Sequence, residues 1–195
     1  MPKTAPLLHM PAICLALLSV FAATPADAAG PAELMAAVRE GRAFAIMRHA
    51  YARGIGDPAN FSLGDCSTQR NLSDQGRTDA RATGGLFKRH GITQAAVYSS
   101  AWCRCRDTAT ALGLGPVETL PALNSFFRSR EHRTSQTAAL RRWLTARDGG
   151  EPLILVSHQV NISALTGQPT RSGEIVVATI DRSGVVDVLG TIDQP

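Results

Sequence analysis

The sequence predicts an α/β fold, built on a mainly parallel β-sheet with an antiparallel edge. Two observations lead to this prediction. Short apolar runs alternate with segments of helical periodicity through most of the chain, which is typical of parallel sheets crossed by helices. The last two apolar runs, 173–180 and 185–192, are joined by the turn signal DRSG and therefore form a hairpin. With 195 residues, 44% of them hydrophobic, the chain can bury the core of one such domain.

Residues 1–28 have the pattern of a secretory signal. Lys3 precedes an apolar stretch at 13–23, and Ala26-Asp27-Ala28 fits the small-x-small pattern that signal peptidase cleaves. The apolar stretch is too short to span a membrane, and no second long apolar run follows it. We expect removal of 1–28 to leave a soluble periplasmic or secreted domain, 29–195.

The mature chain is expected to open with a helix in GPAELMAAVREG, where Leu34 and Val38 share one face. An apolar strand at 43–47 follows. The connection 51–72 is rich in Gly, Asp, Asn, Pro and Ser and has no periodicity, and connections of this length are usually functional or mobile.

Helices and strands alternate after this connection. Ser73 is a candidate N-cap of a helix that Gly91 ends. Asn161 is expected to cap a short helix in ISALTG. The other predicted elements are strands at 95–100, 117–120 and 152–158, a helix within 101–115 and a helix at 136–147.

Three of the predicted parallel strands end in polar residues. Arg48 and His49 follow the first strand, two serines end the second, and Ser157 and His158 end a later one. Ligands of open α/β sheets bind beyond the carboxyl ends of the strands. We therefore expect both histidines to meet there, close to the start of the helix that carries Arg104.

This residue set suits phosphoryl transfer. A neutral imidazole attacks phosphorus, and nearby guanidinium groups disfavour the imidazolium while they hold phosphate oxygens. A second histidine can donate a hydrogen bond to the transferring group. The chemistry requires no metal or other cofactor.

The composition is compatible with an anionic substrate. The formal net charge is +4, and the positive charge is nearly all arginine, since Lys3 and Lys88 are the only lysines. A GC-rich genome also produces such a composition, but arginine binds phosphate with two parallel hydrogen bonds. With 5% aromatic residues and no basic helix, the sequence does not favour nucleic-acid binding.

Cysteines Cys66, Cys103 and Cys105 remain after the expected cleavage. At least one pair is expected to form a disulfide, because exported proteins meet an oxidising compartment. Cys103 and Cys105 are too close in sequence to pair comfortably. Our hypothesis is a Cys66–Cys103 bridge, which leaves Cys105 as a buried free thiol.

Four segments in series resemble the histidine phosphatase superfamily: MRHA, RNLSDQGRTDA, VYSSAWCRCRDTA and VSH. They match an R-H-G/A motif, an R-x-L-[ST]-x-x-G motif, an S-x-x-x-R-x-x-x-T-A motif and a later catalytic histidine. The resemblance implies a three-layer α/β/α sandwich. It also implies that His49 is the nucleophile that becomes phosphorylated, and that Arg48, Arg104 and His158 complete the phosphate pocket.

The proton donor does not follow from the resemblance. Ser125 stands where mutase-like members have an acid, and Gln159 stands where acid-phosphatase-like members have an aspartate. Glu131 is the nearest candidate, and Asp57 and Asp65 are others. Without a strong acid, we expect substrates with good leaving groups, such as acyl or anomeric phosphates or phosphohistidine.

The predicted substrate is a small phosphorylated compound. Arg53 and Arg128 are further candidates for substrate binding, although the charge run of Arg128, Arg130 and Arg133 is also typical of a solvated face. The signal and the tail SHQVNISALTG are similar to small periplasmic members of the family, including those proposed to remove phosphate from lipopolysaccharide core heptose. An envelope phospho-sugar is therefore one candidate.

Two classes of function stay open at this point. The first is a phosphohydrolase that acts through phosphorylated His49. The second is a binding or sensing protein that keeps the phosphate pocket with little turnover. A mutase is a third option, which Ser125 and export disfavour.

Overall fold

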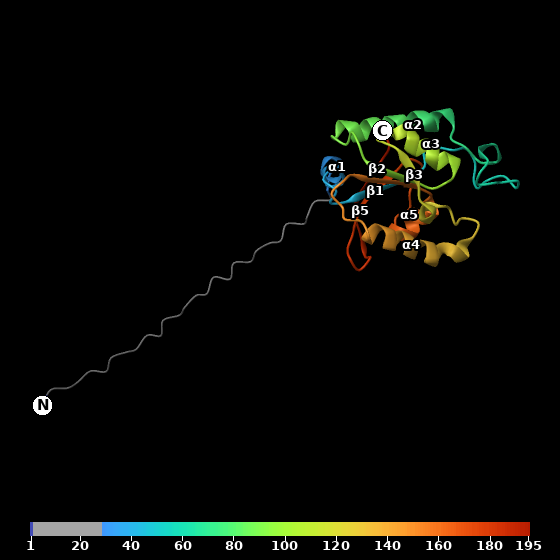
Figure 1. Cartoon of the computed structure of the whole chain (residues 1–195). Helices are drawn as coiled ribbons and strands as arrows, with labels where there is room; N and C mark the ends of the chain where they lie inside the picture. Colours follow the sequence, from blue (N-terminus) through green and yellow to red (C-terminus); the bar gives the residue numbers. More distant parts are fainter. Residues whose placement is uncertain (2–28) are drawn as a thin grey trace.

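A six-stranded β-sheet runs through the middle of the structure, and helices cover both of its faces (Figure 1). The structure is a computed structural model that describes residues 29–195 together with Met1. The expected signal segment therefore lies, apart from Met1, outside the described residues.

The strand order is β3-β2-β4-β1-β5-β6. Strands β3, β2, β4 and β1 pair in parallel, whereas β5 is antiparallel to β1 and β6 is antiparallel to β5. The predicted parallel sheet with an antiparallel edge hairpin is thus confirmed. The strands are β1 (Phe44–Arg48), β2 (Ala96–Ser99), β3 (Val117–Thr119), β4 (Leu153–Ser157), β5 (Ile175–Ile180) and β6 (Val186–Ile192).

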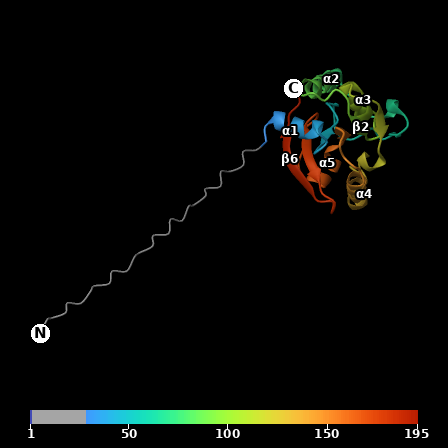
Figure 2. The same cartoon turned by 60° about the vertical axis from the view of Figure 1, so that its left-hand side comes forward.

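Helices α1 (Pro31–Arg39), α2 (Asp74–Arg89) and α3 (Cys103–Leu112) cover one face of the sheet, and α4 (Arg133–Thr145) and α5 (Gln159–Thr166) cover the other (Figures 1 and 2). This arrangement is the three-layer α/β/α sandwich. Three short 3₁₀ turns lie in the connections: η1 (Cys66–Thr68), η2 (Pro121–Leu123) and η3 (Arg130–His132). Within 29–195, no helix combines the length and apolar character that crossing a membrane requires.

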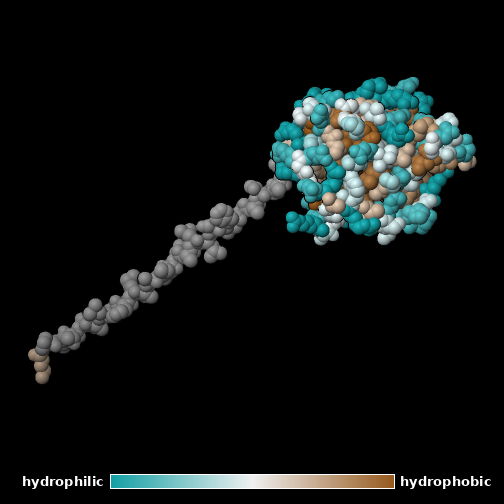
Figure 3. All heavy atoms as spheres, viewed as in Figure 1, coloured by the Kyte–Doolittle hydropathy of each residue, from teal (hydrophilic) through white to brown (hydrophobic). Residues whose placement is uncertain are grey.

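The core lies on both sides of the sheet because successive strand residues point to opposite faces. In β1, Ala45 and Met47 pack under α1, α2 and α3, while Phe44 and Ile46 pack against α4 and α5. All four are buried. The outer surface of the domain is mostly hydrophilic, with separate apolar patches (Figure 3).

Two details of the sequence prediction were wrong. Helix α4 begins at Arg133, three residues before the predicted start at 136, because η3 leads directly into it. Asn161 does not cap a helix, since α5 begins at Gln159 with His158 as its N-cap. The Asn161 amide instead donates a hydrogen bond to the Asn124 carbonyl, 2.8 Å away.

Helices α2 and α3 approach each other at Gly84. A Cβ atom at this position would lie 2.1 Å from the Leu112 carbonyl oxygen. Backbone cannot move aside as a flexible side chain can, so this contact requires glycine.

Gly84→Ala is therefore expected to lower the free energy of unfolding by about 2–3 kcal/mol, because it forces the two helices apart. Gly85→Ala is the matched control. A Cβ there meets only the end of the Arg89 side chain at 3.5 Å, and alanine gains up to about 1 kcal/mol of helix propensity. Urea denaturation of both variants measures the difference, and equal stabilities would contradict the close approach.

Candidate active site

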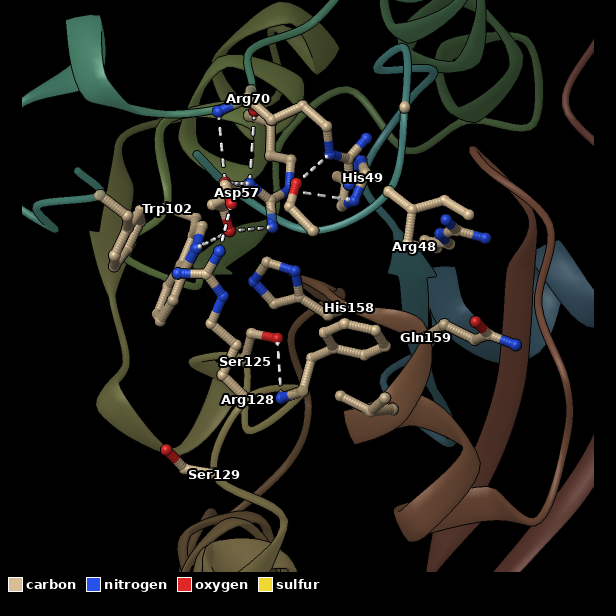
Figure 4. A pocket seen from close by; sticks show the side chains of 17 residues that line it. Arg48, His49, Asp57, Arg70, Trp102, Ser125, Arg128, Ser129, His158 and Gln159 are labelled. Atoms are coloured by element: carbon tan, nitrogen blue, oxygen red, sulfur yellow. Dashed lines mark hydrogen bonds and ion pairs between the residues drawn. The ribbon is translucent and has the colours of Figure 1, made fainter. Parts of the chain in front are cut away.

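A cavity of about 520 Å³ opens at the carboxyl ends of β1, β2 and β4 (Figure 4). The sheet topology brings its polar floor together from distant parts of the chain, as the positions of the strand ends predict. That floor consists of Arg48, His49, Arg70, Arg104 and His158. Arg70 comes from the connection 51–72, and Arg104 from the first turn of α3.

Two hydrogen bonds define the tautomer of His49, which is 2% exposed. Its Nδ1 lies 2.8 Å from the Ala50 carbonyl oxygen, and a carbonyl only accepts, so Nδ1 carries the proton. The Arg104 Nε–H donates to His49 Nε2 over 3.2 Å, and an N–H only donates. His49 Nε2 therefore carries the lone pair of the ring, and this lone pair accepts the hydrogen bond from Arg104.

Both histidines are held in the neutral form. Burial, and then the charge of Arg104, lower the pKa of His49 to about 3. Burial, the neighbouring His49 and the charge of Arg104 lower the pKa of His158 well below its usual range. The two rings meet edge to face, with centroids 5.6 Å apart. A neutral imidazole keeps its lone pair, as a nucleophile must.

Asp57 holds Arg104 in place. The Arg104 guanidinium donates to the two Asp57 carboxylate oxygens over 2.6 and 3.3 Å. Trp102 Nε1 and the Arg70 backbone N–H also donate to this carboxylate, over 3.1 and 3.2 Å (Figure 4). Partial burial acts to raise the pKa of Asp57, but the hydrogen bond and charge of Arg104 outweigh it and hold this pKa below its usual value.

Arg48 and Arg70 complete the positive floor. Arg48 Nη1 donates to the Thr170 carbonyl over 3.1 Å, while its buried Nε has no hydrogen-bond partner among the described residues. Arg70 donates to the carbonyls of Gly56 and Ala52 over 2.8 and 2.6 Å. Three arginines thus line the cavity together with His49, which is an arrangement that attracts a phosphate dianion.

The Nε2 atom of His158 contacts side chains just after β2 and in the first turn of α3. This nitrogen lies 2.9 Å from Ser100 Oγ and 3.4 Å from Cys105 Sγ. Cys105 is a buried free thiol, as the sequence hypothesis states, and burial raises its pKa to about 12. It is therefore an uncharged neighbour of His158 rather than a thiolate nucleophile.

The Cys66–Cys103 disulfide of the sequence hypothesis is present. It joins the connection 51–72 to the first residue of α3, next to Arg104. The Cys103 backbone N–H also donates to Gln69 Oε1 over 3.0 Å. The bridge and this hydrogen bond hold the segment that carries Arg70 against the helix that carries Arg104.

The acidic candidates occupy different places. Asp57 lines the cavity, whereas Glu131 and Asp65 are not among its lining residues. The Glu131 side chain is 72% exposed beside His132, and Asp65 caps η1. Ser125 and Gln159 do line the cavity.

Of the further arginines considered for substrate binding, some line the cavity and others do not. Arg128 lines the cavity and donates to the Asp57 and Pro58 carbonyls. Arg53, Arg130 and Arg133 are exposed and do not line it. Across residues 29–195, no three His, Cys, Asp or Glu side chains gather as ligands for a metal ion.

Residues 45–139 match the family model of the histidine phosphatase superfamily, branch 1. This match decides what the four sequence segments and the geometry suggest. The chain belongs to the histidine phosphatase superfamily.

Several solved structures have a similar fold. The protein histidine phosphatase SixA complexed with tungstate is 21% identical, with 77% of this chain and 96% of that chain covered and a TM-score of 0.53. Mycobacterial glucosyl-3-phosphoglycerate phosphatase with inorganic phosphate is 16% identical, with coverages of 75% and 94% and a TM-score of 0.55. The putative phosphohistidine phosphatase SixA from Agrobacterium tumefaciens is 16% identical, with coverages of 78% and 98% and a TM-score of 0.54. These likenesses show a shared fold, and no curated protein gave a significant match.

Arg70 is the floor residue that the sequence prediction missed. A signal was present, because Arg70 opens the R-x-L-[ST]-x-x-G segment that matches the family pattern. The prediction used this segment for the family resemblance and for the start of a helix, and assigned Arg70 no role in the site. Ser73 does cap α2, by accepting a hydrogen bond from the Gly76 N–H over 3.0 Å.

The depressed pKa of His49 predicts a loss of stability in acid. At pH values between about 3 and the ordinary pKa of 6.5, His49 binds a proton in the unfolded state and stays neutral in the folded state. Stability is therefore lost as the pH falls through this window, by up to about 1.4 kcal/mol per pH unit from His49. We expect the free energy of unfolding of His49→Asn, measured with urea at several pH values, to depend less steeply on pH. Equal slopes in the wild type and the variant would contradict a neutral, buried His49.

Proposed function

We propose that this protein is an exported phosphatase that acts through a phosphorylated His49. The observation that carries the proposal is the unprotonated Nε2 of His49, which accepts a hydrogen bond from Arg104 in a cavity that Arg48, Arg70 and Arg104 also line. A nucleophile inside a cationic clamp is what a metal-independent phosphoryl transfer requires.

The reaction divides into two displacements. In the first, His49 Nε2 gives up its hydrogen bond from Arg104 and forms a bond to phosphorus, while the leaving group departs with the electron pair of the bond that breaks. Arg48 and Arg104 hold the non-bridging oxygens and stabilise their charge. In the second, water attacks phosphorus, the P–N bond breaks, and inorganic phosphate leaves with His49 neutral again.

The site favours substrates with good leaving groups. Asp57 is the one carboxylate among the lining residues, and Arg104 holds it ionised. A phosphoramidate or an acyl or aryl phosphate depends less on a proton donor than an alkyl ester does. A phosphohistidine substrate fits this condition, and the structural likeness to the protein histidine phosphatase SixA supports it.

A phosphorylated sugar is the second candidate. Ser125, Ser129 and Gln159 line the cavity with groups that bind hydroxyls, and one structural neighbour is a glucosyl-3-phosphoglycerate phosphatase. An envelope phospho-sugar, with the heptose phosphatase branch of the family, stays a prediction.

The experiment is an acid-labile phosphoenzyme trap with radiolabelled p-nitrophenyl phosphate and a metal chelator. Wild type is expected to carry label and to hydrolyse the ester, and His49→Asn to do neither, because the P–N bond cannot form. His132→Asn is the matched control, since this exposed histidine lies on η3 outside the cavity lining, and it is expected to label normally.

Other results would replace the proposal. A wild type that binds phosphate without label or turnover would be the binding protein considered above. Dependence of labelling on added metal would contradict the metal-independent mechanism.

Export is supported by the signal pattern of 1–28 and by the disulfide, since disulfides persist in oxidising compartments. The sequence has four cysteines. Cleavage removes Cys14 and the bridge uses two more, so protein from the exported fraction, denatured without reductant, is expected to react with thiol reagent once, at Cys105. Two reactive thiols would mean that the signal is retained, and three would mean that the bridge is absent.

A further inference from the structure

Apolar side chains gather at the mouth of the phosphate cavity. Ile55 and Phe127 are 92% and 42% exposed, and both line this cavity. Exposed large hydrophobic residues are otherwise few in the described part of the chain: Met1, Tyr51, Leu63 and Val185. Apolar surface is visible in Figure 3 at the end of the domain where the connection 51–72 projects in Figure 1.

The wall next to this mouth is aromatic and held in position. The rings of Phe61 and Trp102 stack with centroids 5.2 Å apart and an angle of 19° between their planes. Trp102 Nε1 donates to Asp57, and its ring meets the His158 ring edge to face at 5.3 Å. We call Ile55, Phe61, Trp102 and Phe127 the apolar rim. It begins beside the phosphate floor and extends to the solvent.

The cations near the rim are already engaged. Arg128 donates to the carbonyls of Asp57 and Pro58, and the Arg130 guanidinium lies over the Phe127 ring at 5.5 Å. A substrate that projects from the floor along the apolar rim therefore meets hydrocarbon and ring faces, while Ser125, Ser129 and Gln159 are polar groups elsewhere in the lining. Ring faces and methyl groups bind apolar groups by removing surface from water.

We propose that the apolar rim is the leaving-group subsite, and that it selects phosphorylated compounds whose leaving group is an aromatic ring or a hydrocarbon chain. The proposal rests on the proposed function, because it places the phosphoryl group on the arginine floor. Ile55 and Phe127 are its specificity-determining residues, and Phe61 with Trp102 forms a rigid wall.

Binding of alkylphosphonates, which are not hydrolysed, tests the subsite without requiring turnover. Calorimetry is expected to show that Kd falls at least tenfold from methylphosphonate to hexylphosphonate, since each buried methylene contributes up to about fourfold. Phenylphosphonate is expected to bind more tightly than methylphosphonate, and propylphosphonate more tightly than its dihydroxy analogue. Equal affinities along the series, or tighter binding of the hydroxylated analogue, would overturn the proposal.

Substitutions in the apolar rim test whether these residues cause the dependence of affinity on chain length. Ile55→Ser and Phe127→Ser are expected to reduce the ratio of hexylphosphonate to methylphosphonate affinity at least threefold, because both side chains line the mouth of the cavity. Leu63→Ser is the matched control, since Leu63 lies in the same connection, is 39% exposed and does not line the cavity. An equal effect of Leu63→Ser would overturn the assignment.

The two proposals fail separately. Chain-length-dependent binding without phosphoenzyme would leave the subsite in place and remove the hydrolase. Phosphoenzyme formation with binding that ignores chain length would keep the hydrolase and remove the subsite.

Discussion

The chemistry of this site depends on a single imidazole being held from both sides. The Ala50 carbonyl accepts a hydrogen bond from the Nδ1–H of His49, and the Arg104 Nε–H donates one to Nε2. Burial and the positive neighbours prevent a second proton from binding. Each of these constraints alone leaves the ring free to change tautomer, rotate or become charged. Together they leave one lone pair in one direction, and the arginine floor, the loop that carries Asp57 and the helix that carries Arg104 all serve that geometry.

The sheet brings the two histidines of the site together, and the connection 51–72 adds the remaining side chains of the site. Parallel pairing of β1 with β4 places Arg48 opposite Ser157, so the two strands deliver His49 and His158 to neighbouring positions. The connection 51–72 then folds over this edge and adds Asp57, Arg70 and Phe61, whose ring stacks on Trp102 at the start of α3. Since it has no regular structure apart from η1, its position depends on side-chain hydrogen bonds and on the Cys66–Cys103 bridge.

Sequence reasoning reached the strand ends because apolar runs define where strands stop, and parallel strands stop at one edge. It placed Arg48, His49, Arg104 and His158 together for that reason. It did not place Asp57 on Arg104, because the partner of a residue in an aperiodic loop depends on long-range contacts that carry no period. Asn161 was mistaken for a cap because its residue type suits that position equally well. The side-chain hydrogen bond to Asn124 that explains it spans 37 residues.

The carboxylate of Asp57 is an anion that already binds the guanidinium expected to bind phosphate. Its two oxygens accept hydrogen bonds from Arg104 in a bidentate geometry, which is also how arginine binds phosphate. A phosphate that binds these Arg104 donors must therefore displace the Asp57 carboxylate, an anion that is part of the protein. Exchange of this kind lowers the net affinity for the incoming anion and, by the same free energy, assists its departure. A tethered competitor of this kind makes the site better suited to turning over phosphate than to storing it.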